Sequence, residues 1–333
     1  MVEGGKNRYE LYAISNTGKR INITDAAEGL SWEEGEDELA MKITFTLVNT
    51  KMDNQLLSDY IKINCPVIVK SNWGLGLKQV ADGTIVEAER NTSSNKEAFK
   101  IAAYDSLYNL QKSQDCVYIK KGKNTKNVIS SILKPWNVSI SLYKGPTGVK
   151  HDKICEKSKR LGDILRGVLQ EAKDKGGGKA ICRNVNGKFQ VVMVGSNEDV
   201  YVFTPENSIQ SDYKISTADM VTRVKVLCSE KNSETKPKVR VTVDGKTEYG
   251  IRQVIKTSNK SDSKKDAKKD AQEVLKEKGD PKETMRLTAP DVPPIRKGDM
   301  VRIRAGALNK DYIVKSIQHN ADKGTMTMQV ENK

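Results

Sequence analysis

The residues of this chain that could perform chemistry are two histidines, five cysteines and many carboxylates. A nucleophilic mechanism needs a histidine, lysine or carboxylate held beside a serine or cysteine. His151 lies in a segment rich in glycine, proline and lysine, and His319 lies in a late strand-like segment. Neither has a GxSxG elbow or a catalytic-cysteine motif near it. We therefore interpret both histidines as ordinary surface or half-buried residues, not as members of a catalytic triad.

The five cysteines are odd in number and widely spaced, and most of them lie in apolar or strand-like stretches. This pattern indicates buried free thiols in a protein made in a reducing compartment. Metal binding is not expected, because no CxxC or HxxxH pair occurs. The five are Cys65, Cys116, Cys155, Cys182 and Cys228.

The carboxylates and glycines also form no recognisable site. No local motif singles out a pair of acids of the glycosidase kind. Asp262, Asp266 and Asp270 have helical spacing, but lysines occupy the positions around them, so a cation site is not expected. The glycines at 176–178 follow a predicted helix and precede a predicted strand, the reverse of a phosphate-binding loop. The sequence thus predicts no catalytic, cofactor-binding or metal-binding residue, and no enzyme.

The composition favours several small β-rich domains with a large solvent-exposed surface. The chain has 333 residues, of which 30% are charged and 5% aromatic, and its formal net charge is +14. This charge raises the alternatives of a nucleic acid, an anionic surface or an acidic protein as partner. The cations are interleaved with 43 acids, however, and no basic stripe with stacking aromatics is visible.

No membrane segment or signal peptide is expected from the sequence. No apolar run approaches the roughly 18–20 residues that a membrane helix needs. The first ten residues, MVEGGKNRYE, lack the apolar core of a signal peptide. The expectation is a soluble protein that leaves the cell by lysis or as part of an assembly.

One strand organises the first part of the chain. From Leu39 to Leu47 apolar and polar residues alternate, which predicts a half-buried strand. The acidic segment Glu33–Glu38 before it is expected to be a solvated loop or bulge, with Trp32 as an anchor at the entry. Around it we expect a meandering β-domain with the strands Tyr9–Ile14, Lys19–Ile23, Tyr60–Lys70, Lys78–Arg90 and Lys96–Tyr104, and a short helical exit at Asp105–Lys112.

The middle of the chain mixes helices and strands. A helix is predicted from Asn124 or Thr125 to the residues before Pro135, and Val138–Leu142 is a short strand. Lys159–Lys173 is predicted as a second helix with Ser158 as its cap, because its apolar residues form one stripe. Two strands, Lys179–Val185 and Lys188–Val194, are expected to form a hairpin across Asn186-Gly187.

The last part returns to strands. Met220–Ser229 and Lys238–Asp244 are predicted strands, and Asp244-Gly245 turns the chain into a strand at Glu248–Lys256. Asp262–Lys278 is predicted as a surface helix whose lysines form a solvated face. The final strands are expected at Glu283–Ala289, Met300–Ala305, Asp311–Asn320 and Thr325–Asn332.

Several separated segments match a known family in order and spacing. They are Ile23-Thr24-Asp25 to Trp32 with the Leu39–Leu47 strand, Ala103–Leu107 with Leu110 and Lys112-Ser113, Thr222-Arg223-Val224, Tyr249-Gly250-Ile251, the helix Ala271–Lys278 with Pro281 and Thr284, and Arg296–Val301. On these residues the sequence resembles the tail hub proteins of phages, prophages and tailocins of the XkdQ/YqbQ type, with VgrG and the gene D late-control proteins as distant relatives.

The resemblance implies an α+β, β-rich fold in which two tail-tube-like β-barrel domains flank a smaller α/β insertion. The domains would be residues 1–115, 116–205 and 206–333, the last with a charged surface helix near 262–278. The implied function is a structural baseplate hub of a contractile tail. It would form a homotrimer, a trimeric ring that adapts the six-fold tail tube to the three-fold spike.

The same resemblance implies the partners and the location. The partners would be the tail tube protein, the spike and other baseplate proteins, with a tape-measure or LysM-type tail protein as a further candidate. No membrane, specific nucleic acid or cofactor is implied. The protein would be made in the bacterial cytoplasm and released by lysis within the particle. Two other functions stay open: a tail-associated peptidoglycan hydrolase and a basic nucleic-acid-binding protein.

Overall fold

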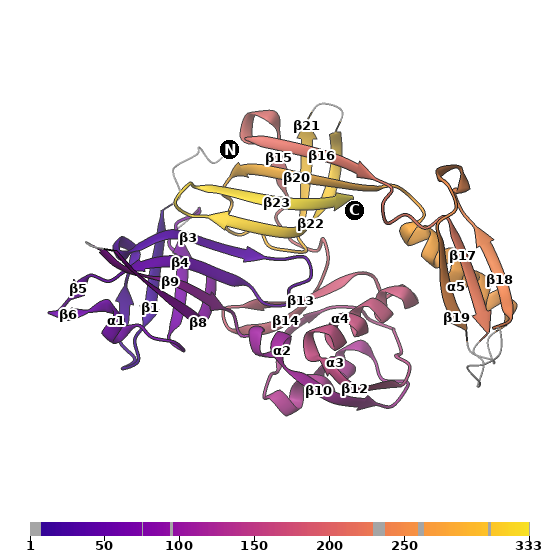
Figure 1. Cartoon of the computed structure of the whole chain (residues 1–333), viewed down its shortest axis with the longest axis horizontal. Coiled ribbons are helices and arrows are strands. Elements are labelled where there is room, and N and C mark those ends of the chain that lie inside the picture. Colours follow the sequence, from indigo (N-terminus) through magenta and orange to yellow (C-terminus); the bar gives the residue numbers. More distant parts are fainter. Residues whose placement is uncertain are drawn as a thin grey trace. The chain divides into compact units, whose positions relative to one another are not determined.

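The chain folds into two compact units (Figure 1). The structure, a computed structural model, describes residues 8–74, 76–93, 96–228, 237–258, 263–305 and 308–332. Unit 1 runs to Ser211 and resumes at Arg286, and unit 2 is Asp212–Met285. Strands dominate and the helices are fewer, which confirms the expected β-rich α+β class.

Most strands of unit 1 belong to one large sheet. Along it the order is β16-β20-β23-β22-β3-β4-β9-β8-β7-β1-β2, with β21 added on β22 and β15 on β21. The strands from the first part of the chain are β1 (Tyr9–Ile14), β2 (Arg20–Asn22), β3 (Ala27–Glu34), β4 (Lys42–Val48), β7 (Pro66–Ser71), β8 (Lys78–Ser93) and β9 (Lys96–Tyr104). Those from the later part are β15 (Tyr201–Phe203), β16 (Gln210–Ser216), β20 (Lys282–Pro290), β21 (Met300–Ala305), β22 (Leu308–Asn320) and β23 (Thr325–Asn332).

The first and last parts of the chain meet where β3 pairs antiparallel with β22. In this register Trp32 lies opposite His319. Within the described residues the strand path is open, ending at β16 and β2. The two-barrel arrangement therefore stays a proposal, while the continuity of the sheet across both parts is a finding that the sequence did not predict.

The organising strand is confirmed as β4, although it begins later than expected. Ile43, Phe45 and Leu47 are buried on one face, and the residues between them are half-buried. The N–H groups of Leu39 and Ala40 donate to the side-chain oxygen of Gln111, at 2.8 and 2.9 Å, instead of to a neighbouring strand. These two residues therefore do not belong to the strand ladder.

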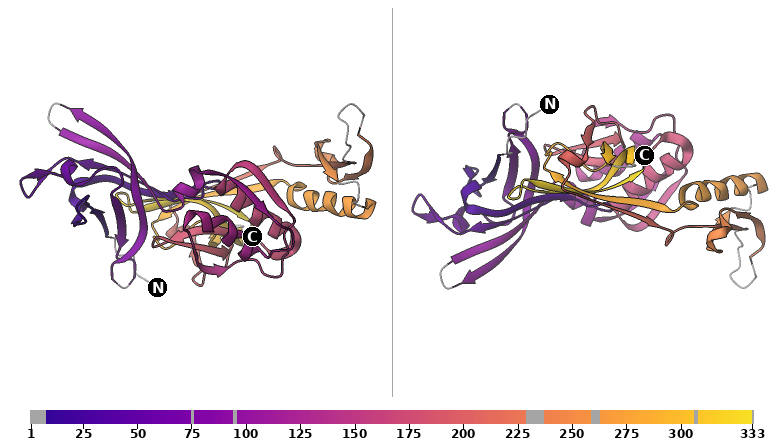
Figure 2. Two further views of the ribbon diagram at one scale, coloured as in Figure 1. Left: turned by 90° about the horizontal axis from the view of Figure 1, so that it is seen from below. Right: turned by 90° about the horizontal axis from the view of Figure 1, so that it is seen from above.

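The neighbouring strands follow the prediction with one exception. β8 and β9 pair antiparallel as a long hairpin that projects from the sheet (Figure 2). The predicted strand Tyr60–Lys70 is wrong in its first half. Leu57–Tyr60 forms the short helix α1, and β7 begins only at Pro66. Asn64 has a positive φ of 72°, which interrupts an extended chain there.

The middle of the chain forms a small α/β insert within unit 1. Its helices α2 (Tyr108–Lys112), α3 (Thr125–Leu133) and α4 (Leu161–Ala172) share an apolar core with its strands. The Asn124 side chain accepts a hydrogen bond from the N–H of Asn127 and caps α3, as expected. The strands are β10 (Gln114–Ile119) with β12 (Ile154–Arg160), and β11 (Ile140–Lys144), β14 (Lys188–Met193) and β13 (Ala180–Val185).

Two details of the insert test the turn and cap predictions. The hairpin β13–β14 is confirmed: Val185 pairs with Lys188, and both Asn186 and Gly187 have positive φ, as a type I′ turn requires. The prediction of Ser158 as a cap is wrong. Ser158 lies inside β12, and α4 begins after Arg160 without a side-chain cap.

Besides the parts of β16 and β20 that extend past Ser211 and before Arg286, the described residues of unit 2 form a three-stranded sheet and one α-helix. The sheet order is β18 (Val239–Asp244), β17 (Arg223–Cys228), β19 (Gln253–Ser258). The expected helix is confirmed as α5 (Lys264–Lys278), capped by Ser263. The predicted strand Glu248–Lys256 begins later than expected, because a 3-10 turn at Thr247–Tyr249 precedes it. β19 starts at Gln253 and pairs in parallel with β17.

Candidate functional site

A buried ion pair joins the end of β3 to the loop before β21. Glu34 is 5% exposed, and Arg296 donates to its two carboxylate oxygens, from Nε at 2.6 Å and from the terminal nitrogen at 2.8 Å. Burial alone would raise the pKa of Glu34, but the guanidinium of Arg296 and the neighbouring Lys297 lower it to about 2. The expectation that Glu33–Glu38 is a solvated segment is therefore wrong at Glu34, because a cation distant in sequence lies opposite it.

Lys297 extends this pair to the acidic loop that follows Glu34. Its backbone N–H donates to Glu34 Oε2 at 3.1 Å. Its ammonium donates to the carbonyl of Gly35 at 2.9 Å and to the carbonyl of Glu38. Burial lowers the pKa of Lys297, and the carboxylate of Glu34 opposes that shift. The side chain thus fixes the path of the loop through backbone oxygens.

The same arginine reaches the insert. Both terminal nitrogens of Arg296 donate to the carbonyl oxygen of Asn184 in β13, each at 3.2 Å. Arg183 donates to Asp299 at 3.2 Å, and Asp299 also accepts from the N–H of Arg296 at 2.9 Å. We call Glu34, Arg183, Asn184, Arg296, Lys297 and Asp299 the charge cluster. It connects the first part of the chain, the insert and the last part.

Asp105 is a further buried carboxyl close to this cluster. Burial raises its pKa to about 7, although the N–H of Leu107 donates to its carboxyl at 2.9 Å and Arg296 lies near enough to act in the opposite direction. A carboxyl of this kind changes charge near neutral pH. The Glu34 carboxyl does not, so the two acids respond to different pH ranges.

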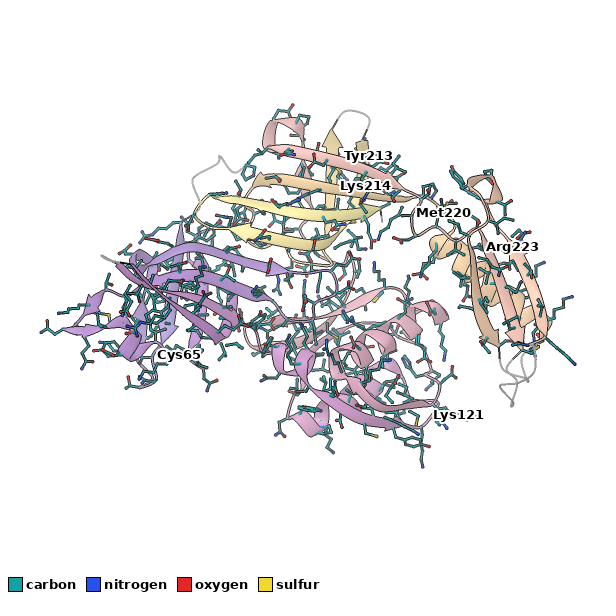
Figure 3. The ribbon with its side chains drawn as sticks, viewed as in Figure 1. Cys65, Lys121, Tyr213, Lys214, Met220 and Arg223 are labelled. Atoms are coloured by element: carbon teal, nitrogen blue, oxygen red, sulfur yellow. The ribbon has the colours of Figure 1, made fainter. Side chains whose placement is uncertain are left out.

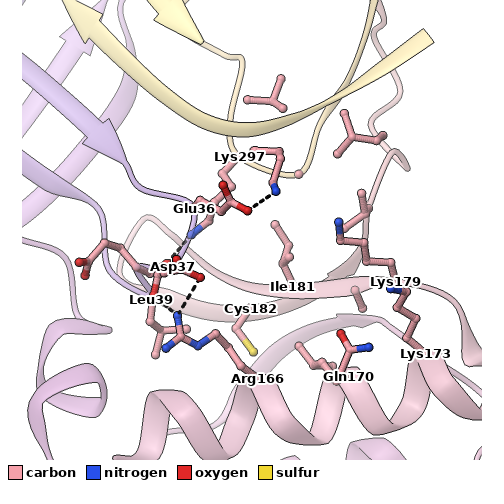
Figure 4. Close-up of a pocket in the computed structure, with 18 of the residues that line it drawn as sticks. Glu36, Asp37, Leu39, Arg166, Gln170, Lys173, Lys179, Ile181, Cys182 and Lys297 are labelled. Carbon is pink, nitrogen blue, oxygen red and sulfur yellow. Dashed lines mark hydrogen bonds and ion pairs between the residues drawn. The ribbon is translucent and has the colours of Figure 1, made fainter. Parts of the chain in front are cut away.

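A cavity of about 310 Å³ lies beside the charge cluster (Figure 4). The acidic loop forms one rim, where Arg166 of α4 donates to the carbonyl of Asp37, and Lys315 pairs with Glu36. The wall includes the thiol of Cys182. Further wall residues are Leu39, Leu165, Leu169, Ile181, Val194, Ile313 and Val314. The cavity therefore has an apolar wall and a rim in which most charges are already paired.

The burial of Cys182 disfavours the nucleophilic form of its thiol. Burial raises the pKa of its thiol to about 12, so the reactive thiolate is scarce at neutral pH. Cys65 is also buried, as the sequence suggested, whereas Cys228 is only half-buried. Cys116 and Cys155 are exposed, which corrects the expectation of buried thiols, because both point to the outer side of the β10–β12 ribbon. All five thiols are free.

The two histidines are buried, which corrects their expected surface or half-buried positions. His151 is 2% exposed, with Nε2 2.9 Å from Thr125 Oγ1 and Nδ1 2.8 Å from Glu171 Oε2. This hydroxyl–imidazole–carboxylate chain has the order of a catalytic triad. Thr125 is only 1% exposed at the start of α3, however, so a substrate has no access to its hydroxyl. The chain of hydrogen bonds holds the loop at His151 against α3 and α4.

His319 lies in the joint between β3 and β22. It is 1% exposed, with Nδ1 2.5 Å from Asp291 Oδ1 and Nε2 3.1 Å from the carbonyl of Ile295. The ring stacks on Trp32 with a centroid distance of 4.7 Å. Tyr9 donates to the other oxygen of Asp291. His319 therefore belongs to a second buried polar group that connects the two parts of the sheet.

The other residues considered for a site, the aspartates near α5 and the glycines at 176–178, have structural roles where the structure describes them. Asp266 accepts from Ser263 in the cap of α5, and Asp262 lies outside the described residues. Gly176 has a positive φ of 84° and ends the helical segment after α4, before β13 begins, so the order expected at the glycines is confirmed. Within the described residues no group of His, Cys, Asp or Glu could hold a metal ion. None of the helices that the structure describes is long and apolar enough to span a membrane.

Comparison with known proteins gives one family and a set of similar folds. Residues 30–333 match the model of the YQBQ-like family. The chain is similar to the 43 kDa tail protein of prophage MuSo2 from Shewanella oneidensis, with a TM-score of 0.69 and 12% identity over 97% of this chain and 98% of that one. It is also similar to a tail protein from Neisseria meningitidis MC58, with a TM-score of 0.69 and 14% identity over 98% and 97%.

A further similar structure is the E. coli c3393 protein, a component of the type VI secretion system that is itself similar to the T4 tail proteins gp27 and gp5. The TM-score is 0.57 at 8% identity, over 100% of this chain and 76% of that one. No curated protein matches the chain. At these identities the similarities establish a shared fold.

Proposed function

Because this chain belongs to the YQBQ-like family, we propose that it is a structural baseplate hub of a contractile phage tail or phage tail-like particle. Three copies form a ring that adapts the six-fold tail tube to the three-fold spike. In this proposal residues 1–115 and 206–333 supply two tube-like β-domains, and residues 116–205 supply the insertion between them. Six tube-like domains in a trimer would match the symmetry of the tube.

The observation that carries this proposal is the charge cluster. Glu34, Asn184 and Arg296 come from three separate parts of the chain, and their hydrogen bonds hold these parts together in the interior of unit 1. Breaking a buried pair leaves an uncompensated charge and costs several kcal/mol, so the arrangement resists deformation. A hub that passes load between a tube and a spike needs such resistance.

The chemistry of the buried groups supports a role without catalysis. The hydroxyl of Thr125 is inaccessible, and the thiol of Cys182 is held protonated by burial. The tail tube protein, the spike and other baseplate proteins are the proposed partners, with a tape-measure or LysM-type protein as a further one. The protein is made in the bacterial cytoplasm and leaves the cell by lysis as part of the particle.

The mass of the purified full chain, measured by light scattering with and without its tail tube protein, tests the proposal. A trimer, or a monomer that becomes a three-fold assembly when tube protein is added, supports the hub. The tube protein of an unrelated phage serves as the control and should have no effect. A monomer that stays indifferent to its own tube protein at every concentration contradicts the proposal.

A further inference from the structure

The strands β10 and β12 of the insert form a ribbon with an uncovered outer face. Among the described residues each pairs only with the other, so each has a free backbone edge. Val117 and Ile119 point inward and are buried in the core of the insert. Tyr118 points outward with 60% of its surface exposed, and Cys155 lies opposite it. The outer face thus carries an aromatic ring between two open edges.

Lysines gather on this ribbon and on the segments that continue it. Lys120 directly follows Ile119, and Lys153 directly precedes Ile154, the residue paired with Ile119. Lys150 forms an isolated β-bridge with Asn124. Figure 3 shows Lys121 at the outer border of the insert. Six exposed lysines belong to this group, and we call them the ribbon lysines: Lys120, Lys121, Lys123, Lys150, Lys153 and Lys157.

The acids near the ribbon lysines are occupied by other groups. Asp152 pairs with Lys175 at 2.9 Å, and Glu156 pairs with Lys159 at 2.9 Å. Asp115 accepts from the indole N–H of Trp136 at 3.2 Å. Among the described residues, the ribbon lysines form no ion pair with any acid. The outer face therefore keeps its positive charge.

Like charges at facing positions of two strands repel each other and destabilise the ribbon. An anionic partner would offset this repulsion and would complement the positive potential of the ribbon lysines. We propose that the outer face of the β10–β12 ribbon binds an extended acidic segment of a partner protein. Such a segment can pair with a free strand edge while its carboxylates face the ribbon lysines and its apolar side chains cover Tyr118.

The ribbon fits a protein better than it fits a nucleic acid. Single-stranded nucleic acids are bound by rows of aromatic side chains that stack on successive bases. On the ribbon, Tyr118 is the exposed aromatic ring among the described residues. The free backbone edges, by contrast, match the hydrogen-bonding groups of another strand. This inference is independent of the proposed hub, because it rests on the insert alone.

Fluorescence anisotropy of a fluorescein-labelled ten-residue glutamate peptide, titrated with the full chain at low salt, tests the proposal. The triple variant Lys120→Glu/Lys121→Glu/Lys153→Glu should bind the peptide at least about tenfold more weakly than wild type. The control Lys264→Glu/Lys268→Glu/Lys269→Glu makes the same change of net charge on exposed lysines of α5. The two triple variants are compared at about 0.1 M salt, where the Debye length is about 10 Å and exposed charges act locally. Under this condition the control should change the affinity by less than about twofold.

Thiol reactivity gives a second readout on the unmodified protein. Bound peptide should slow alkylation of Cys155 by iodoacetamide, because this exposed thiol lies opposite Tyr118. The half-buried Cys228 of unit 2 should react at an unchanged rate. The proposal is overturned by no peptide binding at low salt, by an equal loss of affinity in both triple variants, or by unchanged Cys155 reactivity. Tight binding of a labelled 20-mer DNA in preference to the peptide overturns the assigned partner class.

Discussion

Glu34 and Arg296 stand 262 positions apart in the chain and form a two-point ion pair in the interior of unit 1. The guanidinium also reaches the carbonyl of Asn184, so one side chain connects three segments. The planar geometry of arginine makes this possible, because its terminal nitrogens can serve two acceptors at once. A lysine at position 296 could not replace it.

Replacing Arg296 by methionine should strongly destabilise unit 1. The change leaves the Glu34 carboxylate buried without its main partner, which costs about 3–5 kcal/mol in the free energy of unfolding. Urea unfolding followed by circular dichroism measures the loss. The double variant Glu34→Met/Arg296→Met should recover part of it, because no unpaired charge remains.

Arg302→Met is the matched control for this variant. Arg302 also pairs with an acid, Asp311, at 2.6 Å, but both side chains are much more exposed. Exposed pairs contribute little, so its unfolding midpoint should stay near that of wild type. Equal losses in the Arg296 and Arg302 variants would show that burial of the pair does not matter.

Asp105→Asn should remove a pH dependence of stability. The pKa of Asp105 is about 7 in the folded chain and 3.8 when unperturbed. The protonated carboxyl therefore contributes stability to the fold that is fully present below about pH 3.8 and is lost as pH rises through 7. At about 1.4 kcal/mol per pKa unit, the loss approaches about 4 kcal/mol. Asparagine is uncharged at every pH and can still accept from the N–H of Leu107.

The comparison that checks this is urea unfolding of both proteins between pH 4 and 8. As pH rises, the free energy of unfolding of the wild type should fall relative to that of Asp105→Asn. A constant difference across this range would mean that Asp105 does not titrate in the fold.

The cysteines should react in the order of their exposure. At pH 8, iodoacetamide should modify Cys116 and Cys155 first and Cys228 more slowly. The buried Cys65 and Cys182 should react only after denaturant is added. Peptide mass mapping at several times follows each thiol separately. Rapid modification of Cys182 in the folded protein would contradict its buried, protonated state.

Two glycines should respond in opposite directions to alanine. A Cβ at Gly83 would lie 2.9 Å from the backbone carbonyl atoms of Tyr104, so Gly83→Ala must push β8 away from β9 and should cost about 1–3 kcal/mol. Gly167 is exposed in the interior of α4 with no atom within 4 Å of a new Cβ. Gly167→Ala should stabilise the chain by about 0.5–1 kcal/mol, since alanine favours helix. Thermal unfolding of the two variants gives both signs in one experiment.

Local pattern determined most of the elements. The alternation at Ile43, Phe45 and Leu47 is enough to define β4, and Asn186-Gly187 is enough to define a hairpin turn. The spacing of Ala267 and Ala271 likewise defines the buried side of α5. Such features depend on neighbours within a few positions, and the sequence shows those directly. The boundaries were less accurate, as at Ser158, because caps and ladders depend on contacts outside the segment.

Only the tertiary structure decided how the two parts of the sheet join and which polar residues are buried. The pairing of β3 with β22 brings Trp32 beside His319, and nothing in either segment indicates its distant partner. Glu34 appears as one acid among several in a hydrophilic stretch, and His151 appears as part of a polar loop. Both are buried because their charges or hydrogen-bonding groups find partners from remote segments. A local pattern measures hydrophobicity, whereas the burial of a polar group depends on a partner that only the fold supplies.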